Sequence, residues 1–208
     1  MIALNENQSE ALAELINLAF GLTGAKLSEI SGHRLVLTPP VVASHRIGDL
    51  ARGLDVFASG EVVSVHQAFS GPFSGRAILF LNRDGALTLS HLLSEEHLQG
   101  QLLDTSTDEI LCEIGNMLLS ACLGVFGNLL QIHVNFSVPQ LHQDSFPEFL
   151  ASLAVTPNDL QYAVVINSLF RVRENGVDRP LAIILGISSL EQLAQAIDQW
   201  AGTEAATH

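Results

Sequence analysis

Two groups of polar residues have a spacing that could do chemistry. Both follow the pattern Glu-x-x-x-Glu-x-x-Asn: Glu10, Glu14 and Asn17, and again Glu109, Glu113 and Asn116. An asparagine amide both donates and accepts hydrogen bonds, which suits it to orient a water molecule. The pattern therefore indicates two related candidate sites, each with two carboxylates beside such an amide.

Helical geometry decides how each group is presented. At 100° per residue, Glu10, Glu14 and Asn17 share an arc of about 60°, and the second group repeats this arrangement. The apolar residues of the first segment lie on the opposite side: Leu12, Leu15, Ile16 and Ala19. Glutamate and asparagine also occur on merely solvated helix faces. The recurrence of the whole group favours a site, and the small residues one turn further, Gly21 and Ser120, leave room for a partner.

The two groups belong to an internal repeat offset by 99 residues, from position 10 to position 109, and Pro40 and Pro139 follow in the same register. Each half is expected to contain a helix, a strand, a short helix, two strands and a closing helix. The expected ranges are 7–24, 34–38, 47–53, 60–69, 75–82 and 87–93, then 107–125, 130–138, 146–153, 162–171, 181–186 and 189–200. Gly24 is read as the end of the first helix.

No linker rich in Ser, Gly or Pro separates the two halves. We therefore expect a single domain over residues 1–208, built from pseudo-repeats of about 6–95 and 105–200. Its fold class is α+β, with the two helix-strand-helix-strand-strand-helix repeats arranged by a pseudo-two-fold axis around a largely antiparallel sheet.

Composition limits the classes of partner. The formal net charge is −13 and Lys26 is the only lysine, so the chain lacks the basic footprint of a nucleic-acid-binding protein. An acidic surface instead favours a partner with a basic patch. The N-terminal residues show no signal peptide, and no apolar stretch is long enough for membrane insertion, so we expect a cytoplasmic protein with reduced Cys112 and Cys122.

Other familiar site patterns are missing from the sequence. Its eight histidines form no His-x-x-x-His pair and its two cysteines form no Cys-x-x-Cys, so no metal site is expected. There is also no Gly-x-Gly-x-x-Gly and no Walker sequence. A small-ligand binder of another type has no specific residue pattern in its favour.

At its repeated residues the sequence resembles the CheC, CheX and FliY family of chemotaxis phosphatases. The family signature is Asp or Ser, three residues, Glu, two residues, Asn, twenty-two residues and Pro. The first copy is filled by Glu10, Glu14, Asn17 and Pro40, and the second by Glu109, Glu113, Asn116 and Pro139. Segments 26–32 and 113–116 also look like family segments. Two signatures in one chain are similar to CheC-like members, although both copies have Glu where Asp or Ser is usual.

The resemblance implies an enzyme that hydrolyses the aspartyl phosphate of a CheY-like receiver domain of a response regulator. Asn17 or Asn116 would orient the attacking water, and Glu14 or Glu113 would pair with the receiver's lysine. Glu10 and Glu109 would contact the partner. The chain would need no cofactor of its own, because the receiver carries the Mg²⁺.

A CheD-like deamidase is a second candidate partner, and we expect a monomer. The alternative function is a non-catalytic module of the same fold, which binds a response regulator, acts as an adaptor for such a deamidase, or resembles the rotor proteins of the flagellar switch. Those rotor relatives generally lack the Glu-x-x-Asn pairs, which this chain keeps twice.

Overall fold

The computed structural model describes residues 3–57, 60–71, 74–97, 107–129, 133–154, 162–172, 176–187 and 190–205. The first half contains α1 (Glu6–Ser31), β1 (Leu35–Leu37), β2 (Val41–Arg46), the 3-10 helices η1 (Ile47–Gly53) and η2 (Asp55–Phe57), β3 (Glu61–Ser70), β4 (Gly75–Asn82) and α2 (Arg83–His97). The second half contains α3 (Thr107–Leu129), β5 (Asn135–Phe136), β6 (Gln140–Ser145), α4 (Phe146–Ala154), β7 (Tyr162–Val172), β8 (Arg179–Ile187) and α5 (Leu190–Ala205).

The strands form one sheet in the order β1-β7-β8-β4-β3-β5, with β2 also paired to β7 and β6 to β3. Every pairing among the described strands is antiparallel. The strands β4 and β8 meet at the centre, while β1 and β2 pair with a strand of the second half, and β5 and β6 with a strand of the first. The backbone hydrogen bonds thus cross between the repeats. The expected α+β fold with an antiparallel sheet is confirmed.

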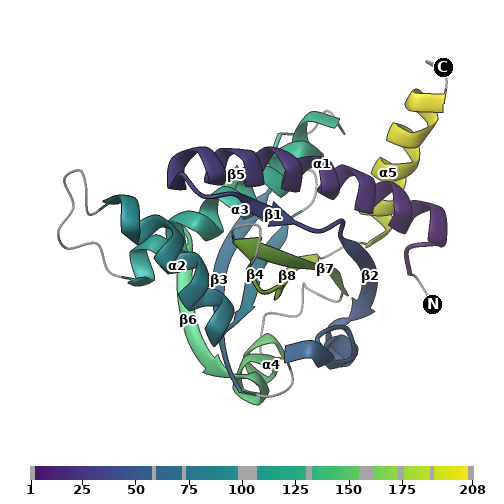
Figure 1. Cartoon of the computed structure of the whole chain (residues 1–208). Coiled ribbons are helices and arrows are strands. Elements are labelled where there is room, and N and C mark those ends of the chain that lie inside the picture. The colour runs from purple at the N-terminus through teal and green to yellow at the C-terminus, as the bar shows by residue number, and fades with distance from the viewer. Residues whose placement is uncertain are drawn as a thin grey trace.

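Helices cover the two faces of the sheet differently (Figure 1). The long helices α1 and α3, together with α2 and α5, pack on one face through a core that includes Ile16, Ile114 and Val65. The short helices η1, η2 and α4 cover the other face, where Phe80 and Phe149 are buried. Because side chains alternate along a strand, β3, β4, β7 and β8 supply residues to both cores. Among the described residues, no helix combines the length and apolar character needed to cross a membrane.

The first helix is longer than its sequence pattern predicts. It begins at Glu6 because Asn5 caps it: the Asn5 side chain accepts a hydrogen bond from the Gln8 backbone amide, and the Gln8 side-chain oxygen accepts one from the Asn5 backbone amide. The prediction that Gly24 ends this helix is wrong. Gly24 is buried inside the helix, where a Cβ would lie 3.5 Å from the Leu35 carbonyl oxygen, an ordinary van der Waals distance. The helix ends at Gly32, whose φ is 62°.

Each repeat also has a strand that the sequence analysis missed, β2 and β6, directly after the signature proline. The expected strand 130–138 is shorter: β5 covers Asn135–Phe136, and residues 130–132 lie outside the described part. The short helix expected at 47–53 coincides with η1, and α4 extends the one expected at 146–153 by one residue. The hydrogen-bonding partners of β2 and β6 belong to the opposite repeat, which explains why local patterns did not reveal these strands.

Candidate active site

The second signature lies on α3, which is fixed by its apolar side. Ile114 and Leu118 are buried against the sheet, while Glu109 and Glu113 point outward and are exposed. Between these two faces, Asn116 is half-buried. Glu109 and Glu113 lie on the polar face that helical spacing predicts, and Asn116 lies at the margin of that face.

Asn116 is held by two hydrogen bonds to one atom. Its Oδ1 accepts from Gln67 Nε2 at 3.0 Å and from the Ser120 hydroxyl at 3.2 Å. These two donors leave the amide nitrogen of Asn116 as the end that can serve a bound group. Two donors, Gln67 Nε2 and the Ser120 hydroxyl, face Oδ1. If the Asn116 amide were turned over, its NH₂ group would face these two donors in place of its oxygen. The orientation of Asn116 is therefore set before any partner binds.

Gln67 reaches Asn116 from β3 and is only 2% exposed. Its amide nitrogen donates a second hydrogen bond to the Ser137 carbonyl oxygen, also at 3.0 Å. The amide nitrogen of Gln67 thus donates to two oxygens, Asn116 Oδ1 and the Ser137 carbonyl oxygen. If the Gln67 amide were turned over, its own oxygen would face both of them without a hydrogen atom between. Within the described part of the chain, Gln67 Oε1 is buried without a hydrogen-bond partner. A buried oxygen without a hydrogen-bond partner lowers the free energy of unfolding by about 1–3 kcal/mol. The residue that holds Asn116 in place therefore destabilises the fold at this point.

Gly115 brings α3 close enough for this contact. A Cβ at position 115 would lie 2.6 to 3.0 Å from three side-chain atoms of Val65 on β3. Any larger residue would push the helix and the strand apart, and the Gln67–Asn116 hydrogen bond spans that same junction. The glycine between Ile114 and Asn116 is thus a packing requirement of the site.

A groove of about 420 Å³ opens beside Asn116, between α1 and α3. The helix α3 contributes Glu113, Asn116 and Ser120 to it, and α1 contributes Leu22 and Lys26. Leu22 is 70% exposed at this rim, so an apolar side chain stands beside the polar ones. The only lysine of the chain therefore faces the same groove as Glu113 and Asn116.

The first signature is placed differently. Glu10, Glu14 and Asn17 lie on the exposed face of α1, as predicted, but none of them lines this groove. In the part of the chain that the structure describes, Asn17 makes no side-chain hydrogen bond. The structure therefore gives the two signatures unequal surroundings.

The repeat itself explains the difference. The backbone links are the same in both halves: the Ala68 amide bonds the Ser137 hydroxyl, and the Leu169 amide bonds the Thr38 hydroxyl, each at 2.9 Å. On β7 the counterpart of Gln67 is Ser168, whose hydroxyl donates to the Thr38 carbonyl at 2.8 Å and extends no further. The counterpart of Ser120 is Gly21, which has no side chain to donate. Both supports of Asn116 are thus absent around Asn17.

Sequence reasoning missed Gln67 and Ser137. Ser137 and Thr38 do stand in the repeat register, two residues before the signature prolines, and this was the available signal. Gln67 carries no such signal, because its counterpart is a serine and it lies 49 residues from Asn116.

The two cysteines do not contribute a nucleophile. Both cysteines are free. Burial raises the pKa of Cys122 to about 12, and burial together with nearby Asp108 raises the pKa of Cys112. Neither thiol is a nucleophile at neutral pH. Among the residues that the structure describes, no group of three or more His, Cys, Asp or Glu could hold a metal ion.

Comparison with known proteins places the fold. No family model and no curated protein matches the sequence. Among solved structures, Thermotoga maritima FliY aligns with a TM-score of 0.73 and 17% identity over 96% of this chain and 98% of that one. The FliM middle domain from H. pylori aligns with a TM-score of 0.60 and 12% identity over 92% and 99%.

The structure of the H. pylori FliG–FliM complex contributes a similar match, with a TM-score of 0.59 and 13% identity over 92% of this chain and 99% of that one. At such identities the likeness concerns the fold. The chain has the fold of FliY, which is the fold that the doubled signature predicted.

Proposed function

We propose that this chain is a CheC-like phosphatase that hydrolyses the aspartyl phosphate of a CheY-like receiver domain, with Glu113 and Asn116 as its better organised site. The observation that carries the proposal is the fixed amide of Asn116 at the edge of a groove that also contains Glu113. The doubled signature and the shared fold with FliY support it.

The reaction requires positioning more than new covalent chemistry. The receiver supplies the phosphoryl group, the Mg²⁺ and a lysine. The water oxygen accepts a hydrogen bond from the Asn116 amide nitrogen and uses a remaining lone pair to attack phosphorus. The bond from phosphorus to the aspartyl oxygen breaks, the carboxylate leaves, and the water proton passes to the released phosphate or to solvent. Atoms and charge balance without an intermediate on this chain.

Glu113 fixes the register of the two proteins by pairing with the receiver's lysine. Glu109, one turn earlier on the same face, contacts the partner beside it. Leu22 at the groove rim adds apolar contact area. Lys26 lies where it can face the negative charge of the acyl phosphate. Glu10, Glu14 and Asn17 provide a second, less organised copy on α1. A receiver partner of this kind places the chain in the cytoplasm.

The decisive experiment measures the lifetime of a phosphorylated receiver with the chain and its variants. We expect Asn116→Ala to remove most of the acceleration and Asn17→Ala, its matched control, to remove less, because only Asn116 is held in place. Losing one positioned water contact costs a factor of about 10² to 10³ in rate. An Asn17→Ala Asn116→Ala double variant that is folded and still shortens the lifetime would sink the mechanism.

The second candidate function is non-catalytic binding, and the likeness to the FliM middle domain favours it. The H. pylori FliM was solved in complex with FliG, so this fold serves as a protein-binding module there. An adaptor for a CheD-like deamidase belongs to the same class. This candidate predicts that the chain binds a receiver or another partner while the phosphoryl lifetime stays the same, so the experiment above separates the two.

A further inference from the structure

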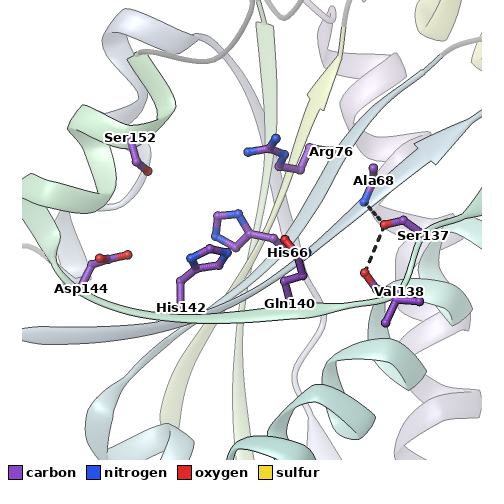
Figure 2. A pocket seen from close by; sticks show the side chains of 9 residues that line it. All are labelled: His66, Ala68, Arg76, Ser137, Val138, Gln140, His142, Asp144 and Ser152. Atoms are coloured by element: carbon purple, nitrogen blue, oxygen red, sulfur yellow. Dashed lines mark hydrogen bonds between the residues drawn. The ribbon is translucent and has the colours of Figure 1, made fainter.

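A second hollow lies on the sheet face opposite α1 and α3 (Figure 2). Its volume is about 700 Å³. His66 and Arg76 stand on the same strand faces as the buried residues Ile78 and Phe80, beneath α4. The strand β6 contributes His142 and Asp144 at the other side. None of the signature residues lines this hollow, although Ser137, whose carbonyl oxygen accepts from Gln67, does.

Two histidine rings, tilted by 48° to each other, form its floor. The ring centroids of His66 and His142 are 4.4 Å apart, and the Phe149 ring meets His66 nearly at right angles. Ser64 Oγ lies 2.9 Å from His66 Nε2 and fixes the ring. Burial, His142 and Arg76 lower the pKa of His66 to about 3, so this ring is neutral at physiological pH. His66 therefore offers a flat surface without a formal charge.

The formal charges of the hollow lie on either side of the rings. Figure 2 shows the Arg76 guanidinium on one side of the histidine pair and the Asp144 carboxylate on the other. Both residues are half-buried. Among the described residues, neither has a hydrogen-bond or ion-pair partner, whereas Arg83, Arg171 and Arg179 each pair with a carboxylate.

Arg46 and Arg52 also lack an ion-pair partner in the described part of the chain, but both are exposed, whereas Arg76 is half-buried in a chain with a net charge of −13. A half-buried guanidinium has five N–H donors in a geometry that matches an oxyanion, and acidic side chains are abundant in this sequence. Leaving Arg76 unpaired forgoes charge-assisted hydrogen bonds that a ligand would supply. The Asp144 carboxylate repels a simple anion and requires a donor in its place. A ligand that satisfies both ends carries both kinds of group.

We propose that this hollow binds a small dipolar molecule, with an acidic oxyanion on Arg76, a hydroxyl or ammonium donor on Asp144, and its body over the rings of His66 and His142. The volume is in the usual range for small-molecule sites, about 300–1,000 Å³. The acidic group is a carboxylate or a phosphate, both of which suit a guanidinium. The proposal does not depend on phosphatase activity.

The test is a titration of the ¹⁵N-labelled full chain followed by backbone amide NMR. The probes are ω-amino acids from β-alanine to 6-aminohexanoate, O-phosphoethanolamine, and hexanoate as the matched acid without a donor. We expect saturable shifts in β3, β4 and β6 with at least one amino compound. Hexanoate should bind at least about tenfold more weakly than 6-aminohexanoate, which corresponds to about 1.4 kcal/mol. The tighter of the carboxylate and phosphate probes identifies the acidic group.

Variants assign the two ends. Arg76→Gln should weaken the best probe at least about tenfold, and Arg76→Lys should retain part of the affinity. Asp144→Asn should remove the preference over hexanoate. Arg52→Gln, which changes an exposed arginine outside the hollow, is the matched control and should bind as the parent chain does. The spectra also report whether each variant is folded.

Three results would overturn the proposal. The first is that no probe gives saturable shifts in these strands. The second is that a folded Arg76→Gln variant binds the best probe as tightly as the parent chain. The third is that hexanoate binds as tightly as 6-aminohexanoate to the parent chain, which would exclude a role for Asp144.

Discussion

The hydrogen bonds that hold Asn116 can be removed while the charged groups of the groove stay in place. Gln67→Met substitutes a side chain of similar length without the amide donor, and Ser120→Ala removes only the hydroxyl. Each hydrogen bond to Asn116 Oδ1 is worth about 0.5–1.5 kcal/mol. If the fixed amide lowers the reaction barrier, losing one bond slows turnover by about 2- to 13-fold. Losing both slows it by about 5- to 150-fold.

The assay mixes phosphorylated receiver with each variant and follows the loss of phosphate over a range of receiver concentrations. Gln67 is buried and cannot touch the receiver, so Gln67→Met should lower kcat and leave KM unchanged. The variant also leaves the Ser137 carbonyl without its donor. It also removes the unsatisfied Gln67 Oε1, so the two effects on the free energy of unfolding oppose each other, and urea denaturation measures their balance separately.

Ser168→Ala is the matched control, because Ser168 is the counterpart of Gln67 in the other repeat. It removes a hydrogen bond to the Thr38 carbonyl at 2.8 Å without contacting either signature asparagine, so kcat should remain at the parent value. The reasoning is refuted if the folded Gln67→Met Ser120→Ala variant turns over as fast as the parent chain. An equally lowered kcat in Ser168→Ala would also refute the reasoning, because the loss of rate would then follow from a general loss of stability and not from the freed Asn116 amide.

Two further predictions concern stability. Gly115→Ala should destabilise the fold by about 1–3 kcal/mol in urea denaturation, because its Cβ would overlap Val65. In the same helix, Gly124→Ala meets no atom within 4 Å and should stabilise by up to about 1 kcal/mol; equal effects of the two changes would contradict the packing role of Gly115. The second prediction follows from the lowered pKa of His66. In the unfolded chain His66 takes up a proton near pH 6.5, whereas in the folded chain it does so only near pH 3. The free energy of unfolding therefore falls as the pH drops from 6.5 to 3, by about 1.4 kcal/mol per pH unit at most. Denaturation curves at several pH values should show a smaller loss in His66→Gln, and an unchanged slope would argue against the lowered pKa.

Residue spacing in the sequence was sufficient to predict those features of the fold that depend on a single helix. The apolar and polar faces of α1 and α3 follow from the positions of residues such as Ile114 and Glu113, because a helix turns by a constant angle per residue. The 99-residue register in turn indicated two equivalent halves. These properties concern neighbours in the chain, so they can be read without a tertiary structure.

The residues 140–145 show where that reasoning ends. This segment is mostly polar, with the sequence Gln-Leu-His-Gln-Asp-Ser, and its composition does not predict a strand. It becomes β6 because its backbone pairs with β3. A strand at the margin of a sheet requires backbone hydrogen bonds and little side-chain burial, and the partner strand belongs to the other repeat.

The same limit applies to the site. The sequence by itself determined that Asn17 and Asn116 occupy equivalent positions, each on the helix face opposite the apolar one. Only the tertiary structure decided that they differ, because Gln67 reaches Asn116 from another strand while the shorter Ser168 stops at the Thr38 carbonyl. A hydrogen bond depends on the distance between atoms in space. Within one helix, the number of residues between two side chains fixes the distance between their atoms. Between a helix and a sheet, that distance is fixed by how the two elements pack.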